Sequence, residues 1–103
     1  MIDSTAETLR RAADRLERLA ARAPQGQWSA RGLLASRPEV VATDADGHSE
    51  HVAEARAGTA PWIVATAPAI AAPLVAWLRA TADEPGPHPP PAVDLAETVL
   101  ASV

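Results

Sequence analysis

The residues best suited to chemistry are two histidines and the acidic side chains around them. His48 and His51 stand close to Asp44, Asp46 and Glu50, and these residue types are common ligands of metal ions. However, the Asp-x-Asp-Gly run lacks the third acid and the closing Glu of a calcium-binding loop. On a strand, His48 and His51 would also point to opposite faces, because successive side chains alternate. We therefore interpret this segment as a solvated hairpin tip and expect neither a bound metal nor a cofactor.

Nucleophiles and paired carboxylates occur without a recognisable catalytic arrangement. The sequence holds no Cys, which excludes thiolate catalysis and disulfide bonds. None of its Ser residues lies in a G-x-S-x-G elbow. The acids that could act as a general acid–base pair stand in segments expected to be exposed, and they are Asp44, Asp46, Glu50 and Glu54. We predict that the protein is not an enzyme.

Four arginines repeat at helical spacing near the N-terminus. They are separated by four, three and four residues, so they align on one side of a helix, and they are Arg11, Arg15, Arg18 and Arg22. Acidic residues stand between these arginines at spacings that allow ion pairs along the helix, and they are Glu7, Asp14 and Glu17. Such mixed charge is the ordinary pattern of a solvated helix. A net charge of −4 argues against a nucleic-acid protein. We predict a solvated or protein-facing surface, with DNA binding as the alternative.

A long uncharged run dominates the second half of the chain. From Ala57 to Leu78, twenty-two residues pass without a charged side chain. Such a length raises the question of a membrane span, but three prolines interrupt the run, namely Pro61, Pro68 and Pro73. We therefore expect two short buried helices and no membrane association.

Three tryptophans are the only aromatic residues. We predict that Trp28, Trp62 and Trp77 provide the main volume of a small, Ala-rich core. A stripe at three-four spacing runs from Ile63 to Thr81 and includes Trp77 on its buried side. The alternative is a ligand cleft lined by Trp28 and Trp62, because Trp is favoured at binding surfaces.

The elements that carry these residues follow from periodicity and turn signals. Apolar residues at alternating spacings of four and three predict a first helix from Ser4 to about Ala23. Between residues 27 and 55, short strands bounded by turn residues predict a three-stranded antiparallel meander, with a hairpin at Asp46-Gly47. Two short helices follow over the uncharged run. Residues 83–91 form a Pro-rich linker, and residues 92–103 a last helix.

Several of these segments together resemble a known group of proteins. The turn PQGQW at residues 24–28 ends an Arg/Ala-rich helix, an Asp-Gly hairpin follows, and then come APWIVA at residues 60–65 and LVAWL at residues 74–78. This order resembles small actinobacterial and phage-borne proteins of unassigned function, which read TPGPW, then strands, then A-x-[FY]-I-A and L-A-x-W-L. Here PQGQW replaces PGPW, and Trp62 stands at the Phe/Tyr position. The resemblance covers roughly residues 5–82 and implies an α+β fold and a prokaryotic accessory role.

We therefore expect an α+β protein with one domain over residues 1–82, a linker over 83–91 and an amphipathic helix over 92–103. The N-terminus lacks the basic and apolar regions of a signal peptide, which favours the cytoplasm. Residues 1–37 carry a charge of +3 and residues 38–103 a charge of −7, so two copies could attract each other.

The predicted function is a non-catalytic interaction module that forms a homodimer. In that dimer the last helix would cross to the other copy and present an apolar face, made of Val93, Val99, Leu100 and Val103. Folding back onto the same chain is the alternative position of this helix. The alternative functions are a small-molecule binder with the Trp-lined cleft and a DNA-associated accessory protein using the Arg stripe.

Overall fold

The computed structural model describes residues 4–32 and 38–102 and confirms the α+β class. Its chain forms two compact units, a helical unit of residues 1–20 and 71–103 and a sheet unit of residues 21–70. The domain boundaries expected at residues 82 and 91 do not coincide with the limits of these units. Residues 84–102 belong to the helical unit, together with most of the first helix.

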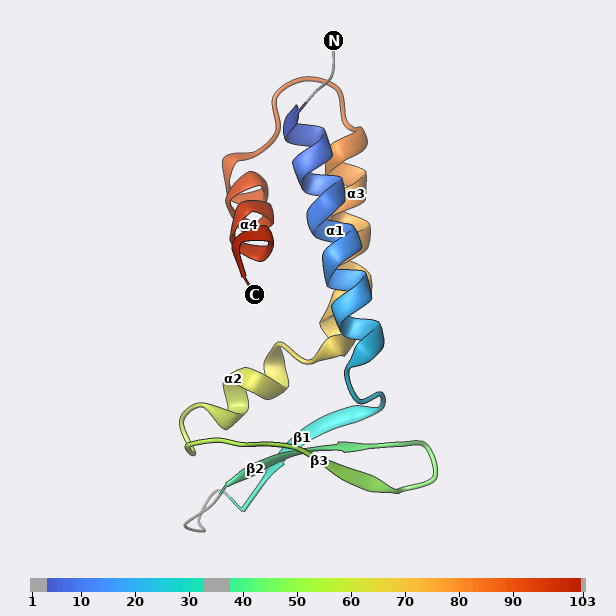
Figure 1. Ribbon diagram of the computed structural model, residues 1–103, viewed down its shortest axis with the longest axis vertical. Coiled ribbons are helices and arrows are strands. Elements are labelled where there is room, and N and C mark those ends of the chain that lie inside the picture. The colour runs from blue at the N-terminus through green and yellow to red at the C-terminus, as the bar shows by residue number, and fades with distance from the viewer. Residues whose placement is uncertain (1–3, 33–37, 103) are drawn as a thin grey trace. The chain divides into compact units, whose positions relative to one another are not determined.

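The helical unit consists of α1 (Ser4–Arg22), α3 (Ala71–Asp83) and α4 (Pro90–Ala101), which lie side by side (Figure 1). Its core is made of small side chains around two leucines. Leu9 of α1 and Leu78 of α3 are fully buried, and the remaining buried members are Ala6, Ala12, Ala13, Val75, Ala82, Ala92 and Ala96. Because alanines let helices approach closely, this core holds three helices together with little apolar volume.

The last helix begins earlier than the sequence predicted. Pro90 and Pro91, expected in the linker, form the first turn of α4. A proline lacks the backbone N–H that would be unpaired in a first turn anyway, so it fits there without loss of a hydrogen bond. The connection between α3 and α4 is therefore confined to residues 84–89.

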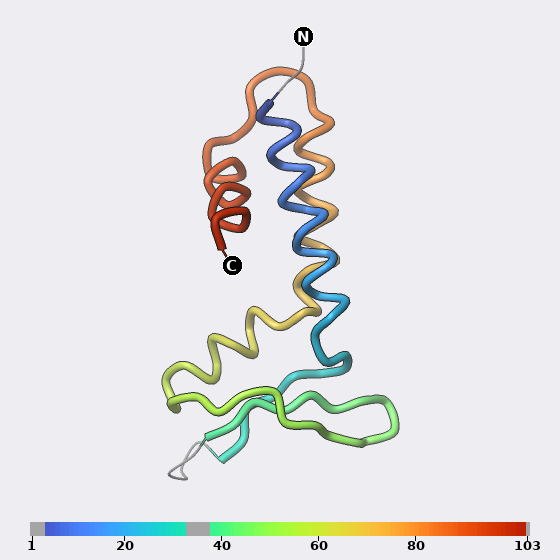
Figure 2. Tube along the Cα trace, viewed as in Figure 1, coloured from blue at the N-terminus to red at the C-terminus, as the bar shows by residue number. Residues whose placement is uncertain are grey.

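The sheet unit contains the predicted antiparallel meander, with strands β1 (Gln27–Arg31), β2 (Glu39–Thr43) and β3 (Ser49–Glu54) in that order (Figure 2). The central strand is the most buried, since Val40, Val41 and Ala42 are almost fully covered. A register irregularity between Val40 and Val41 marks a bulge in the pairing of β2 with β3. The two strands are joined by the expected Asp-Gly hairpin, where Gly47 has a φ of +84°.

The uncharged run is broken into separate elements, as its prolines predicted. A short helix, α2 (Ala60–Ala65), lies against β1 and β2 in the sheet unit. A 3₁₀ turn, η1 (Pro68–Ile70), follows, and regular helix resumes at Ala71. Pro73 is the third residue of α3, where its missing N–H is harmless.

By length and composition alone, Ala60–Asp83 is apolar enough to cross a membrane, with a mean hydropathy of 1.6. Only 22% of its most apolar window is buried. The run expected to form the core therefore leaves much of its apolar surface uncovered.

Candidate functional site

The arginine stripe lies on α1, and one of its members reaches α4. Arg15 is partly buried, and its Nη2 donates a hydrogen bond to the carbonyl oxygen of Ser102, at the end of α4. A cation at this position also interacts favourably with the negative end of the helix dipole. Arg11, Arg18 and Arg22 are exposed. The stripe is thus part of the packing of α4 as well as a charged surface.

The acids of α1 pair with α3, and the predicted pairing of Asp14 and Glu17 with the arginines of the stripe is wrong. Arg79 donates from Nη2 to Asp14 Oδ1 at 2.9 Å and from Nη1 to Glu17 Oε2 at 3.0 Å. The hydrogen bond and charge of Arg79 hold the pKa of Glu17 below its usual value, and the two acids raise the pKa of Arg79. Among the described residues, Arg11, Arg15 and Arg18 form no ion pair with a carboxylate.

A cavity of about 170 Å³ opens beside these unpaired arginines. It is lined by residues of α1 and by one residue of α4, and they are Arg11, Asp14, Arg15, Arg18 and Leu100. The Nε of Arg15 is buried and has no hydrogen-bond partner. Buried donors are normally paired, so this N–H marks a position where an acceptor is missing.

The apolar residues of α4 face the core of their own chain. Val99 and Leu100 are partly buried and pack against the residues of α1 and α3. Val93 is also partly buried, and Val103 lies outside the described residues. This is the arrangement of a helix that folds back. Exchange between two copies would preserve the same contacts with the partner's helix in place, so it stays a prediction.

The tryptophans do not fill the core, and that prediction is wrong. Trp62 is 69% exposed and Trp77 is 46% exposed. Trp28 is partly buried, and its Nε1 donates to the carbonyl oxygen of Pro24 at 2.9 Å. The largest fully buried side chains are instead Leu9, Leu78, Val40 and Val41. The break at residues 66–70 shifts the helical phase, so the buried seam of α3 runs through Ala71, Val75, Leu78 and Ala82 and not through Trp77.

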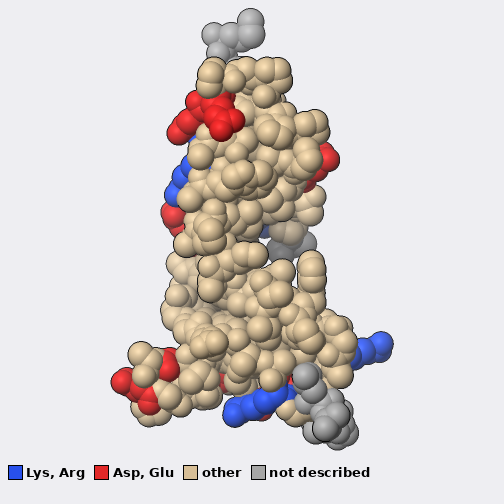
Figure 3. Space-filling view, turned by 180° about the vertical axis from the view of Figure 1, so that it is seen from behind, with Lys and Arg blue, Asp and Glu red and all other residues tan. Residues whose placement is uncertain are grey.

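The outward face of α3 carries apolar side chains from Ala72 to Ala80, and the exposed Asp83 ends it. Its exposed apolar residues form two adjacent rows, which are Ala72, Ala76 and Ala80 in one and Pro73 and Trp77 in the other. Figure 3, seen from behind Figure 1, shows that the surface over this helix is uncharged along most of its length. We call these five residues the α3 face. No separate signal for this face was found in the sequence, because Trp77 and the uncharged run around it were expected in the core.

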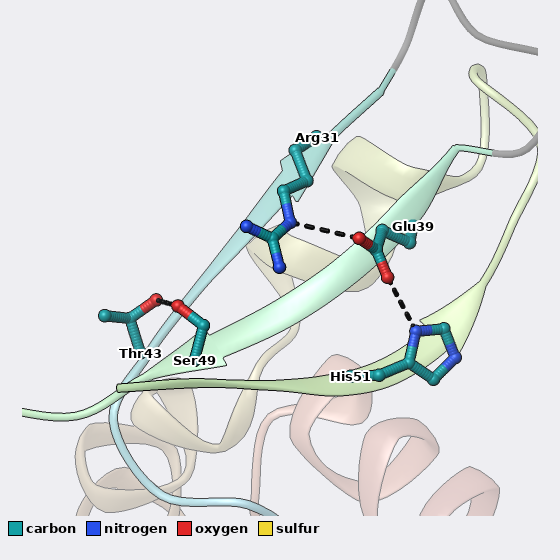
Figure 4. A network of polar contacts seen from close by, with 5 residues as sticks. All are labelled: Arg31, Glu39, Thr43, Ser49 and His51. Carbon is teal, nitrogen blue, oxygen red and sulfur yellow. Dashed lines mark hydrogen bonds and ion pairs between the residues drawn. The ribbon is translucent and has the colours of Figure 1, made fainter. Parts of the chain in front are cut away.

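A polar network covers one face of the sheet and was also missed (Figure 4). Arg31 Nε donates to Glu39 Oε1 at 3.0 Å, and His51 Nδ1 lies 2.7 Å from Glu39 Oε2. Thr43 and Ser49 share a hydrogen bond of 2.7 Å. The hydrogen bond from His51, followed by the contacts of Arg31, lowers the pKa of Glu39. The register explains the grouping, because Glu39 pairs with Arg31 on one side, while the bulge brings His51 toward it on the other.

The hairpin tip keeps its candidate ligands close together but on the surface. One side-chain atom from each of Asp44, Asp46 and His48 lies within 4.8 Å of the others, and all three residues are exposed. Asp44 Oδ1 accepts hydrogen bonds from the backbone N–H groups of Asp46 and His48, both at 2.9 Å. The carboxylate therefore has a structural role in closing the turn.

A second cavity, of about 290 Å³, adjoins this tip and is lined by Gln25, Ala42, Asp44, His48, Ser49 and Glu50. Trp28 and Trp62 line neither this cavity nor the one beside the arginines. The two residues proposed for a ligand cleft thus do not border either space.

Comparison of the chain with protein-family models, with curated proteins and with solved structures gives no match. The resemblance to small actinobacterial and phage-borne proteins therefore stays an expectation from the sequence.

Proposed function

We propose that this chain is a non-catalytic, cytoplasmic interaction module that forms a homodimer through the α3 face. The observation that carries the proposal is the exposure of Trp77 at 46% among exposed Ala and Pro side chains from Ala72 to Ala80. A helix whose outward face is apolar as well as its core-facing side is typical of a position covered by a neighbour. Exposed tryptophan surrounded by small apolar residues is also the composition of an interaction hot spot.

The arrangement of charges on α3 supports a protein partner. Arg79 and Asp83 are the only charged residues of the helix, and both pair with side chains of α1. Arg79 pairs with Asp14 and Glu17, and Asp83 pairs with Arg10 at 3.0 Å. A partner on the α3 face would therefore meet charges of α3 that are already paired, which lowers the cost of burying this face.

A second copy of the chain fits this face better than a charged partner. Each copy carries a net charge of −4, so contact through a surface without charged side chains is favoured over contact between acidic regions. In a two-fold pair, the same patch on both subunits must offer a projection and a recess. Trp77 provides the projection, and the row Ala72, Ala76 and Ala80 provides a shallow recess beside it. Because one helix face is small for a permanent interface, we expect a weak dimer in the micromolar range.

Sedimentation velocity of the purified full chain, from low to high micromolar concentration, tests the proposal. Ala80→Glu places a charge within the α3 face at an exposed helical position, so we expect a folded monomer. Ala65→Glu adds the same charge at an exposed position of α2 and should leave dimerisation unchanged. Circular dichroism confirms that both variants fold.

Three results would contradict the proposal. The full chain could remain monomeric throughout, or Ala80→Glu could dimerise as well as the parent chain. The second result would favour exchange of α4, which leaves the α3 face uncovered. Recovery of the protein only with detergent would instead assign the α3 face to a membrane.

A further inference from the structure

We infer that Arg11, Arg15 and Arg18 form a binding site for the phosphate group of a small molecule, in the cavity beside the end of α4. This site is independent of the homodimer, because its residues lie on α1 and α4 and none belongs to the α3 face.

The first argument is the local charge. A helix with interleaved acids normally neutralises its own arginines, but Arg79 takes up Asp14 and Glu17 from the other side. Arg10 is engaged separately by Asp83. The described residues therefore leave Arg11, Arg15 and Arg18 without a carboxylate, in a protein whose overall charge is negative.

The second argument is the missing acceptor. Arg15 uses Nη2 to bind the carbonyl oxygen of Ser102, while its Nε is buried and unpaired. That carbonyl fixes the guanidinium group and holds it at the wall of the cavity. A guanidinium group donates in a planar fork that matches the oxygen atoms of a phosphate, so one anion in the cavity could bind the guanidinium groups of Arg11, Arg15 and Arg18 together.

The third argument is size. Pockets for drug-sized ligands range from about 300 to 1,000 Å³, and this cavity measures about 170 Å³. It is therefore suited to a single tetrahedral anion or to the phosphate end of a small ester. Leu100 supplies an apolar wall, and Asp14 contributes the one carboxylate of the lining, whose charge Arg79 offsets. The lining therefore contains three positive charges and one carboxylate that Arg79 already neutralises, and this excess of positive charge favours an anion with two negative charges.

Titration of the ¹⁵N-labelled full chain with inorganic phosphate, at constant ionic strength set with chloride, tests the inference. The Nε–H resonances of arginine report each guanidinium group directly. We expect saturable shifts of the Nε–H signals of Arg11, Arg15 and Arg18, and no shift for Arg22, which does not line the cavity. Glycerol phosphate, tested in parallel, distinguishes a site for free phosphate from one for a phosphate ester.

The variants Arg11→Gln and Arg18→Gln remove one donor group each without touching the contact of Arg15 with α4. Each should weaken phosphate binding by about tenfold, the effect of losing a charge-assisted hydrogen bond. Arg22→Gln is the matched control and should leave the affinity unchanged. Linear, unsaturated shifts, equal shifts of Arg22, or full affinity in Arg11→Gln and Arg18→Gln would overturn the inference. Binding of duplex DNA without binding of inorganic phosphate would overturn it as well and assign the stripe to nucleic acid.

Discussion

Gly26 should be one of the least replaceable residues of the sheet unit. It occupies the turn before β1 with a φ of +107°, a backbone conformation that side chains rarely adopt. A Cβ atom at this position would lie 2.4 Å from the carbonyl oxygen of Thr43 and 2.9 Å from its carbonyl carbon. Both are backbone atoms at the end of β2, so rotation of a side chain cannot relieve the contact.

The cost of Gly26→Ala has two parts. An alanine forced into a sparsely populated backbone region costs about 1–3 kcal/mol. The overlap with Thr43 adds a further cost of the same order, because the turn or the end of β2 must move. Gly47 separates the two parts, since its φ is +84° but no atom lies within 4 Å of a Cβ built there. Gly47→Ala should therefore show the backbone cost alone.

Urea unfolding of the parent chain and of the two variants, followed by circular dichroism and tryptophan fluorescence, measures the difference. We expect Gly26→Ala to lower the free energy of unfolding by about 3–4 kcal/mol, a large part of the stability of a small domain. Gly47→Ala should lower it by about 1–2 kcal/mol. If Gly26→Ala costs no more than Gly47→Ala, the close approach of Gly26 to Thr43 does not exist in solution.

Three other outcomes follow from burial and charge. Leu78→Ala should lower the free energy of unfolding by about 2–5 kcal/mol because Leu78 is fully buried. Trp77→Ala should lower it by only about 2 kcal/mol because nearly half of Trp77 is already exposed. If thermal or urea unfolding shows equal losses for the two variants, Trp77 is buried in solution. NMR titration of the Glu39 carboxyl should give a pKa below the ordinary 4.5. The lowered pKa stabilises the fold at pH values above the pKa of Glu39 in the unfolded chain. This stability is lost as the pH falls through the pKa of Glu39 in the folded chain. His51→Gln should raise the pKa of Glu39, and an unchanged value would show that their contact is absent in solution. Elemental analysis after dialysis should find no stoichiometric zinc or calcium, because Asp44 is already engaged by the backbone of the turn; retention of either metal would assign the hairpin tip to metal binding.

The local elements could be predicted because their signals lie within a few residues. The seam of α1, the Asp-Gly hairpin and the prolines of the uncharged run each act on neighbouring backbone groups, and each gave the observed element. The start of α4 was missed because the same residue, proline, is typical both of an extended linker and of a first helical turn. Composition alone does not separate these two uses.

The tryptophans were misplaced for a different reason. Assigning Trp77 to the core required a continuous helical phase across the uncharged run, and the turn at residues 66–70 interrupts it. A phase change moves each side chain around the helix axis, and Leu78 takes the buried position instead of its neighbour. The number of residues in such a break depends on how the flanking elements pack, which periodicity does not report.

The ion pairs of α1 could not be predicted from helical periodicity either. They also connect the α3 face with the cavity beside the arginines of α1. Arg79 lies 62 residues from Glu17 and 65 from Asp14 in the sequence, so their pairing could not be read from helical spacing. Once formed, that pairing links Arg79 of α3 to α1, and Asp83 is linked to Arg10 of α1 in the same way. The charges that border the α3 face are therefore paired, and the three arginines of α1 are left without their nearest acids. The apolar surface and the basic cavity follow from one set of ion pairs between the two helices.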